Sequence, residues 1–158
     1  MSILKFRAHT WAAAVALGVV ALVPSQAGAD ASRERMQRGK AAFLSQCLNC
    51  HQTIDEAAGG YRQQPAWQKI VADMVARGAK LDAAQQEAVV EYVTGRMLLV
   101  AKCSSCHTSN RPLTASKSFE EWQSTVELMA QKLPTNLRPT AEQIEKLTVF
   151  LAVERPRP

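Results

Sequence analysis

The sequence predicts an all-α protein that consists of two copies of one short helical unit. Apolar residues recur at helical spacing in several stretches, and N-terminal capping patterns precede these stretches. No stretch shows the alternation of polar and apolar residues that is typical of a half-buried strand. Two five-residue motifs of the same form lie 56 residues apart, which indicates an internal repeat.

The composition is that of an ordinary globular protein. Of the 158 residues, 47% are hydrophobic and 21% are charged, and glycine and proline number seven each. These values exclude a low-complexity disordered chain and a collagen-like repeat, and they argue against a coiled coil. The length leaves no room for a large multidomain enzyme. The formal net charge of +5, taken alone, would suggest nucleic acid or an acidic membrane as a partner.

The first 29 residues are predicted to form a cleavable secretory signal peptide. Lys5 and Arg7 form a short basic region, residues 11–23 are apolar or small, and residues 27–29 match the A-x-A cleavage pattern. A retained membrane anchor is the alternative, but 13 apolar residues are fewer than the roughly 20 that span a bilayer. We therefore expect a mature chain that begins at Asp30, with 17 basic and 14 acidic residues, in the periplasm.

Turn and capping residues predict the helices of the mature chain in order. A first helix contains Met36, Pro65 suits the first turn of a helix that contains Trp67, and Gly78 marks the turn after it. Later helices open on three capping patterns, namely Asp82 with Gln85, Ser118 with Glu121, and Thr140 with Gln143. Apolar residues follow two of these patterns at helical spacing, namely Ala88, Val89 and Tyr92 in one helix and Ile144, Leu147, Phe150 and Leu151 in the other.

The segment between the two copies is predicted to be helical without a break. Residues 91–99 contain no proline, no serine-rich linker and no run of charges. The last helix of the first copy should therefore continue directly into the first helix of the second copy. This arrangement predicts a rigid junction.

Both motifs have the form C-x-x-C-H, which is the signature of covalent haem attachment. The first comprises Cys47, Cys50 and His51, and the second comprises Cys103, Cys106 and His107. Two thiols at this spacing can add across the two vinyl groups of one porphyrin, and the adjacent imidazole can then reach the iron. All four cysteines of the chain are used in this interpretation.

Three other interpretations of the cysteines are weaker. An exported protein with four cysteines usually forms two disulfides, but two disulfides explain neither the C-x-x-C spacing nor the histidine that follows each pair of cysteines. A structural zinc site usually has its C-x-x-C pairs about 15–20 residues apart, whereas 52 residues separate Cys50 from Cys103. A thioredoxin-like dithiol would need a strand–helix–strand pattern around the motif, and neither motif has one.

The repeat extends beyond the motifs and divides the mature chain at about residue 95. Equivalent residues of the two copies are Gly39 and Gly95, Phe43 and Leu99, Trp67 and Trp122, Met74 and Met129, and Tyr92 and Phe150. We therefore expect one unit over residues 30–95 and a second over residues 96–158. Units of this length bury little apolar surface alone, so we expect the haem faces to supply much of each core.

The chain resembles class I c-type cytochromes over nearly the whole mature sequence, once in each copy. The resemblance rests on the glycine, the apolar residue four positions later, the C-x-x-C-H motif and the aromatic residue in the terminal helix. It implies that Gly39 faces Tyr92 and that Gly95 faces Phe150 where helices cross. The spacing from tryptophan to methionine is similar to that in haem subunits and domains of periplasmic dehydrogenases, which accept electrons from the catalytic subunit.

The sixth iron ligands are predicted to be Met74 and Met129. His9 lies in the signal peptide and the other two histidines belong to the motifs, so no third imidazole remains in the mature chain. Methionine is a frequent partner of histidine in electron-transfer cytochromes, and these two methionines are equivalent in the repeat. Core packing is the alternative role for a methionine seven residues after a tryptophan. Trp67 and Trp122 are expected to pack on the haem faces.

These inferences together predict an electron-transfer protein with no catalytic residues. Two covalently attached haem c groups would take electrons from a periplasmic dehydrogenase and pass them to a terminal oxidase or another cytochrome. Nucleic acid is not an expected partner, and no long apolar segment follows the signal peptide. The alternative is a small dihaem enzyme or ligand sensor, in which one haem keeps an open or exchangeable position.

Overall fold

The computed structural model describes residues 26–53 and 62–156, which form helices and no strands. Helix α1 spans Gln26–Ala42 and continues into a short π-helix, η1 (Phe43–Cys47). The first half also contains α3 (Gln64–Ala76), and α4 (Ala83–Cys103) links the halves. The second half comprises α5 (Asn110–Leu113), α6 (Phe119–Lys132), the 3-10 turn η2 (Thr135–Leu137) and α7 (Ala141–Glu154). The predicted all-α class is confirmed for these residues.

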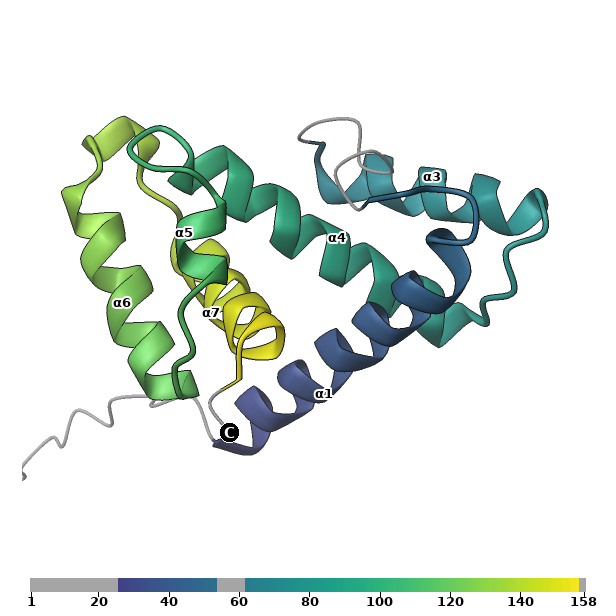
Figure 1. Cartoon of the computed structure of the whole chain (residues 1–158), viewed down its shortest axis with the longest axis horizontal. Coiled ribbons are helices and arrows are strands. Elements are labelled where there is room, and N and C mark those ends of the chain that lie inside the picture. The colour runs from purple at the N-terminus through teal and green to yellow at the C-terminus, as the bar shows by residue number, and fades with distance from the viewer. Residues whose placement is uncertain (1–25, 54–61, 157–158) are drawn as a thin grey trace, which may run out of the picture.

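Helix α4 is the central element of the fold. Helices α1, α3 and α7 all pack against it, and α6 packs on α7 (Figure 1). In this view α3 lies at one end of the molecule and α6 lies at the other, with α4 between them. In the first half α3 packs against the crossing helices α1 and α4, and in the second half α6 packs against the crossing helices α4 and α7. Helix α4 therefore belongs to both halves.

The predicted capping boxes are confirmed at the starts of three helices. The side chains of Asp82, Ser118 and Thr140 each accept a hydrogen bond from the backbone N–H three residues later, and the side chain of that later residue accepts one from the backbone N–H of the cap residue. Pro65 lies in the first turn of α3, as expected. Gly78 follows α3 with a φ of 112°, a conformation that glycine adopts without steric cost.

The predicted continuity between the copies is also confirmed. Helix α4 runs without interruption through residues 91–99, and residues 92–99 are all buried. A helix that is buried around its whole circumference needs neighbours on several sides, which α1, α3 and α7 provide. The expected boundary between Gly95 and Arg96 therefore lies inside one rigid helix.

The two glycines of the repeat lie where helices cross. A Cβ atom on Gly39 would overlap the carbonyl group of Ala88 and lie 3.2 Å from the Cβ of Tyr92. A Cβ atom on Gly95 would lie 3.0 Å from the Cβ of Phe150. Both crossings agree with the expectation that each glycine faces the terminal aromatic residue of its copy. At Gly39 the helices approach too closely for any side chain, and at Gly95 a Cβ atom would require Phe150 to shift.

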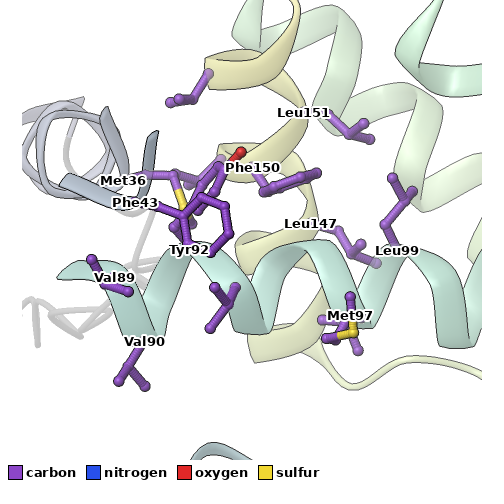
Figure 2. Packing of buried hydrophobic residues seen from close by; sticks show 14 of the residues in the cluster. Met36, Phe43, Val89, Val90, Tyr92, Met97, Leu99, Leu147, Phe150 and Leu151 are labelled. Atoms are coloured by element: carbon purple, nitrogen blue, oxygen red, sulfur yellow. The ribbon is translucent and has the colours of Figure 1, made fainter. Parts of the chain in front are cut away.

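Aromatic rings connect the two crossings. The ring of Tyr92 lies 5.6 Å from that of Phe43 and 5.7 Å from that of Phe150, measured between centroids. Figure 2 shows these rings with Met36 at the place where α1, α4 and α7 meet. Edge-to-face and tilted ring pairs at this separation add roughly 0.5–1.5 kcal/mol each beyond the area that they bury. The core is therefore continuous from one half to the other.

Helix α1 contacts the second half along much of its length. The Lys40 ammonium lies 3.3 Å from a carboxylate oxygen of Glu154 at the end of α7. Burial and the neighbouring Glu154 carboxylate raise the pKa of Tyr92, so its phenol stays protonated. The guanidinium of Arg33 lies 5.0 Å from the centroid of the Phe119 ring at the start of α6. These contacts join the two halves in addition to the shared α4.

The predicted signal peptide lies almost wholly outside the described residues. Only residues 26–29 of that segment fall within the described part of the chain, in the first turn of α1. No described helix is long and apolar enough to cross a membrane.

Candidate functional site

The first C-x-x-C-H motif opens onto a cavity of about 540 Å³ in the first half. Cys47 ends η1, and its carbonyl accepts hydrogen bonds from the backbone N–H groups of Cys50 (3.2 Å) and His51 (3.0 Å). This tight turn brings both cysteines and the histidine to the same cavity wall. Trp67 and Met74 of α3 line the same cavity.

The second motif opens onto a separate cavity of about 500 Å³ in the second half. Cys103 ends α4, and Cys106 and His107 follow in the turn after it. Trp122 and Met129 of α6 line this cavity as well. Each cavity thus gathers two cysteines, a histidine, a tryptophan and a methionine from equivalent positions of the repeat.

The walls of the two cavities are apolar and their charged lining residues are all basic. Phe43, Val71 and Val89 are among the apolar residues of the first wall, and Leu99 and Leu147 are among those of the second. Arg77 and Lys80 line the first cavity, and the second is lined by Lys102, Arg111, Lys117 and Lys132. Within the described segments, no Asp or Glu lines either cavity.

This set of residues fits a haem group in each cavity. Two thiols, an imidazole and a thioether are suitable for covalent attachment and for iron ligation. The apolar walls match a porphyrin ring, and the basic residues match its two propionate groups. Cys47, Cys50, His51 and Trp67 would hold the group in the first cavity together with Met74, and their repeat equivalents would hold the group in the second.

The four cysteines do not come together as a zinc site would require. No group of three or more His, Cys, Asp or Glu side chains in residues 26–53 and 62–156 is placed to hold a metal ion. Burial raises the pKa of the Cys47 thiol, and burial together with the charge of Cys106 raises that of Cys103. The thiols of Cys47 and Cys103 are therefore neutral at pH 7.

The imidazole of His107 is oriented by the backbone. Its Nδ1 lies 3.1 Å from the carbonyl oxygen of Thr108. A carbonyl oxygen only accepts, so Nδ1–H is the donor and the lone pair of Nε2 stays available for a metal. A hydrogen bond of this kind fixes the ring and raises its basicity as a ligand.

The methionines divide into two pairs. Met74 and Met129 line the cavities, as a ligand role requires, although Met129 is 38% exposed. Met36 and Met97 are fully buried in the core, and neither lines a cavity. The placement of Met74 and Met129 is also compatible with a packing role, so their ligation stays a prediction.

Two features of the cavities have no clear signal in the sequence. The basic residues that line them come from loops and helix ends that are far apart in the chain, and periodicity does not connect them. The two tryptophans also differ. The indole Nε1 of Trp122 donates to the carbonyl of Arg155 at 3.4 Å, whereas the buried Nε1 of Trp67 has no acceptor in the described part of the protein.

This difference predicts unequal effects of removing the two indole N–H groups. Trp122→Phe should lower the free energy of unfolding by roughly 0.5–1.5 kcal/mol more than Trp67→Phe, because only Trp122 loses a hydrogen bond. Both variants lose the same side-chain volume, and the two tryptophans are 1% and 3% exposed, so each serves as the control for the other. Chemical denaturation of the haem-loaded variants measures both values. An equal or larger loss for Trp67→Phe would mean that the Trp67 indole has an acceptor outside the described chain.

Comparisons with known proteins gave no match. A scan of protein-family models found none, and searches of curated proteins and of solved structures likewise returned none. The site is therefore interpreted from its own residues.

Proposed function

We propose that this protein is a periplasmic dihaem c-type cytochrome of the class I type. It takes electrons from a dehydrogenase and passes them to a terminal oxidase or another redox carrier. One observation carries the proposal: each of two separate cavities gathers a C-x-x-C-H motif, a tryptophan and a methionine from equivalent repeat positions. A single cavity of this composition could arise by chance, whereas two equivalent ones favour a common role.

The residues of each cavity have distinct roles in this proposal. The two cysteines would attach the haem covalently, and the histidine and the methionine would bind its iron. A bound haem supplies reversible one-electron chemistry, and the protein sets its potential through ligand identity, burial and nearby charge. The apolar walls exclude water from the iron. No acid–base or nucleophilic group beyond the motif residues is needed, since the protein carries electrons and transforms no substrate.

Mass spectrometry of the exported protein tests the attachment directly. The expected mass is that of a chain starting at Asp30 plus two haem groups, and peptides that contain each motif should carry one haem apiece. A mass without haem, or with a disulfide between the cysteines of a motif, would refute the proposal. Mixing the loaded protein with purified periplasmic dehydrogenases then identifies the donor, because rapid reduction produces a spectral change.

Replacing a ligating methionine should change one haem at a time. Met74→Ala or Met129→Ala should lower the potential of the affected haem by a sizeable part of the roughly 0.8 V over which axial ligands act. It should also open that iron to carbon monoxide. Potentiometric titration and the spectrum of the reduced protein with carbon monoxide measure both effects.

The buried methionines provide the matched controls. Met36→Leu and Met97→Leu preserve side-chain volume in the core and should cost less than about 1.5 kcal/mol, with the potentials unchanged. Unaltered spectra in both Met74→Ala and Met129→Ala would rule out these residues as ligands. Carbon monoxide binding by the unaltered protein would instead favour the alternative of a ligand sensor or small haem enzyme.

A further inference from the structure

We propose that the surface around the second cavity, and not the surface around the first, is the docking site for a redox partner with an acidic face. We define the second-cavity face by Lys102, Arg111, Lys117, Lys132 and Arg138, together with Met129 and Leu137. The inference rests on the proposed function, because it counts the haem propionates in each cavity. It assigns to one end of the molecule a role that the repeat alone would give equally to both.

The lining charges of the two cavities differ once propionates are counted. Arg77 and Lys80 line the first cavity, and two propionates would neutralise them. The second cavity is lined by Lys102, Arg111, Lys117 and Lys132, so two positive charges remain after the same neutralisation. Arg138 in the adjacent loop adds to this excess. Among the described residues, a cationic surface that persists in the loaded protein is thus expected only in the second half.

The distribution of charge along the chain reinforces this difference. Residues 30–95 contain eight basic and eight acidic residues, whereas residues 96–158 contain nine basic and six acidic residues. The acidic residues of the second half lie on α6 and α7, and none of them lines the cavity. The stretches 99–118 and 128–141, which contribute most of the lining, contain five basic residues and no acidic residue. The positive charge is therefore concentrated on this face and is not spread evenly over the second half.

Several basic side chains of this face are held in place. The Lys102 ammonium donates to the carbonyl of Leu137 at 3.2 Å, which connects the end of α4 to η2. The Arg138 guanidinium donates to the carbonyls of Leu133 (3.0 Å) and Gln131 (3.2 Å) at the end of α6. Lys117 lies over the Trp122 ring, 5.8 Å from its centroid. Cations that are already ordered lose less conformational entropy when a partner binds.

Exposed apolar side chains accompany these cations. Met129, which lines the second cavity, is 38% exposed. Leu137, whose carbonyl oxygen accepts a hydrogen bond from Lys102, is 46% exposed, and Leu128 of α6 is exposed as well, although neither of them lines the cavity. In the described part of the first half, the one exposed large apolar side chain is Leu44, and no exposed large apolar side chain lines the first cavity. An apolar centre within a charged rim is typical of transient protein interfaces, and complementary charge mainly raises the association rate.

A protein partner fits this face better than a membrane. Interfacial helices bind lipid through a long apolar face opposite a polar one, whereas here only three large apolar side chains are exposed. The cations also surround the mouth of a cavity, where close approach of a second redox centre would shorten the path for an electron. An acidic protein surface that covers this mouth satisfies both features.

The first experiment locates anion binding without any electron transfer. Hexacyanochromate, a paramagnetic and redox-inert trianion, broadens the amide resonances of residues near the places where it binds. We expect broadening concentrated in residues 99–118 and 128–139 of the haem-loaded protein, with little effect around the first cavity. Equal broadening in both halves, or broadening centred on the first cavity, would overturn the inference. Absence of haem in the mass spectrum would refute the proposed function separately, before docking is tested.

The second experiment measures docking with an acidic blue-copper protein, plastocyanin, as the probe. Lys132→Glu should slow electron transfer by roughly fivefold or more at low ionic strength, and the difference should shrink as salt is added. Lys69→Glu is the control, because it makes the same change of net charge on an exposed lysine of α3 that lines no cavity, and the exposed ion pair with Asp73 that it breaks contributes little. Equal rates for the two variants would overturn the inference, provided that both carry two haems.

A vesicle assay distinguishes the membrane alternative. The loaded protein is sedimented with vesicles of phosphatidylcholine and phosphatidylglycerol at physiological salt. We expect no binding that depends on Lys132. Binding to these vesicles that Lys132→Glu abolishes, without any effect of this variant on the reaction with plastocyanin, would reassign the face to a lipid surface.

Discussion

Preparing this protein without haem is expected to leave it largely unfolded. The two cavities of about 540 and 500 Å³ are walled by apolar residues from α3, α4, α6 and α7. Without haem these apolar walls stay in contact with water and add little to the core, whereas a bound haem would bury them. Units of this length bury little other apolar surface, and the whole stability of a domain is only about 5–15 kcal/mol. Loss of both haems is therefore expected to exceed what the remaining core can offset.

The measurement compares the chain made in the cytoplasm, where haem is not attached, with the exported protein. Far-ultraviolet circular dichroism should show reduced helicity for the haem-free chain and no cooperative thermal transition. A double variant, Cys47→Ala with Cys50→Ala, extends the comparison. Helix α4 lines both cavities. The loss of the first haem in this variant should therefore also lower the melting temperature of the second half. A haem-free chain with full helicity and a sharp transition would contradict this account.

Gly39→Ala is expected to be the most damaging single substitution in the helices. The added methyl group would overlap the carbonyl group of Ala88, which is backbone and cannot rotate away. Helices α1 and α4 would have to separate, and this would open the contact between Phe43 and Tyr92. Overpacking usually costs about 1–3 kcal/mol and more where the backbone must move, so we expect at least about 3 kcal/mol here.

Gly95 and Gly78 provide controls with smaller expected losses. Gly95→Ala places its methyl group 3.0 Å from side-chain atoms of Phe150, which can shift by a few tenths of an ångström, so its cost should be smaller. Gly78→Ala meets no atom within 4 Å and loses only the freedom to adopt a positive φ, which costs about 1–2 kcal/mol. Thermal unfolding of the three haem-loaded variants measures the order. A loss at Gly78 equal to that at Gly39 would contradict the role of the crossing.

The local features of this protein could be predicted from the sequence because they depend on neighbouring residues. A capping box needs only two side chains three residues apart, and all three predicted boxes form. The uninterrupted α4 follows from the absence of any breaking residue between Glu91 and Leu99. The C-x-x-C-H motifs are likewise contiguous, so the chemistry that they favour could be inferred before any fold was known. The resemblance of each half to a cytochrome unit is still a prediction.

The composition of the candidate sites depends on residues that are far apart in the sequence. Equivalence in the repeat predicted that Met74 and Met129 share a role, but only the tertiary structure places each beside the thiols and imidazole of its own motif. The repeat already separated Met74 and Met129 from the other two methionines, and the tertiary structure adds that Met36 and Met97 are buried in the core.

By itself the sequence determined the helical class, the two motifs, the repeat and the continuity of α4, since each depends on residues close together in the chain. Only the tertiary structure decided how the two copies differ. Lys40 lies beside Glu154 and Arg33 beside Phe119, although more than half of the sequence separates the two members of each pair. The cations of the second cavity come from separate loops. Such contacts depend on how the helices pack, and packing sums many weak interactions between distant residues that no local pattern records.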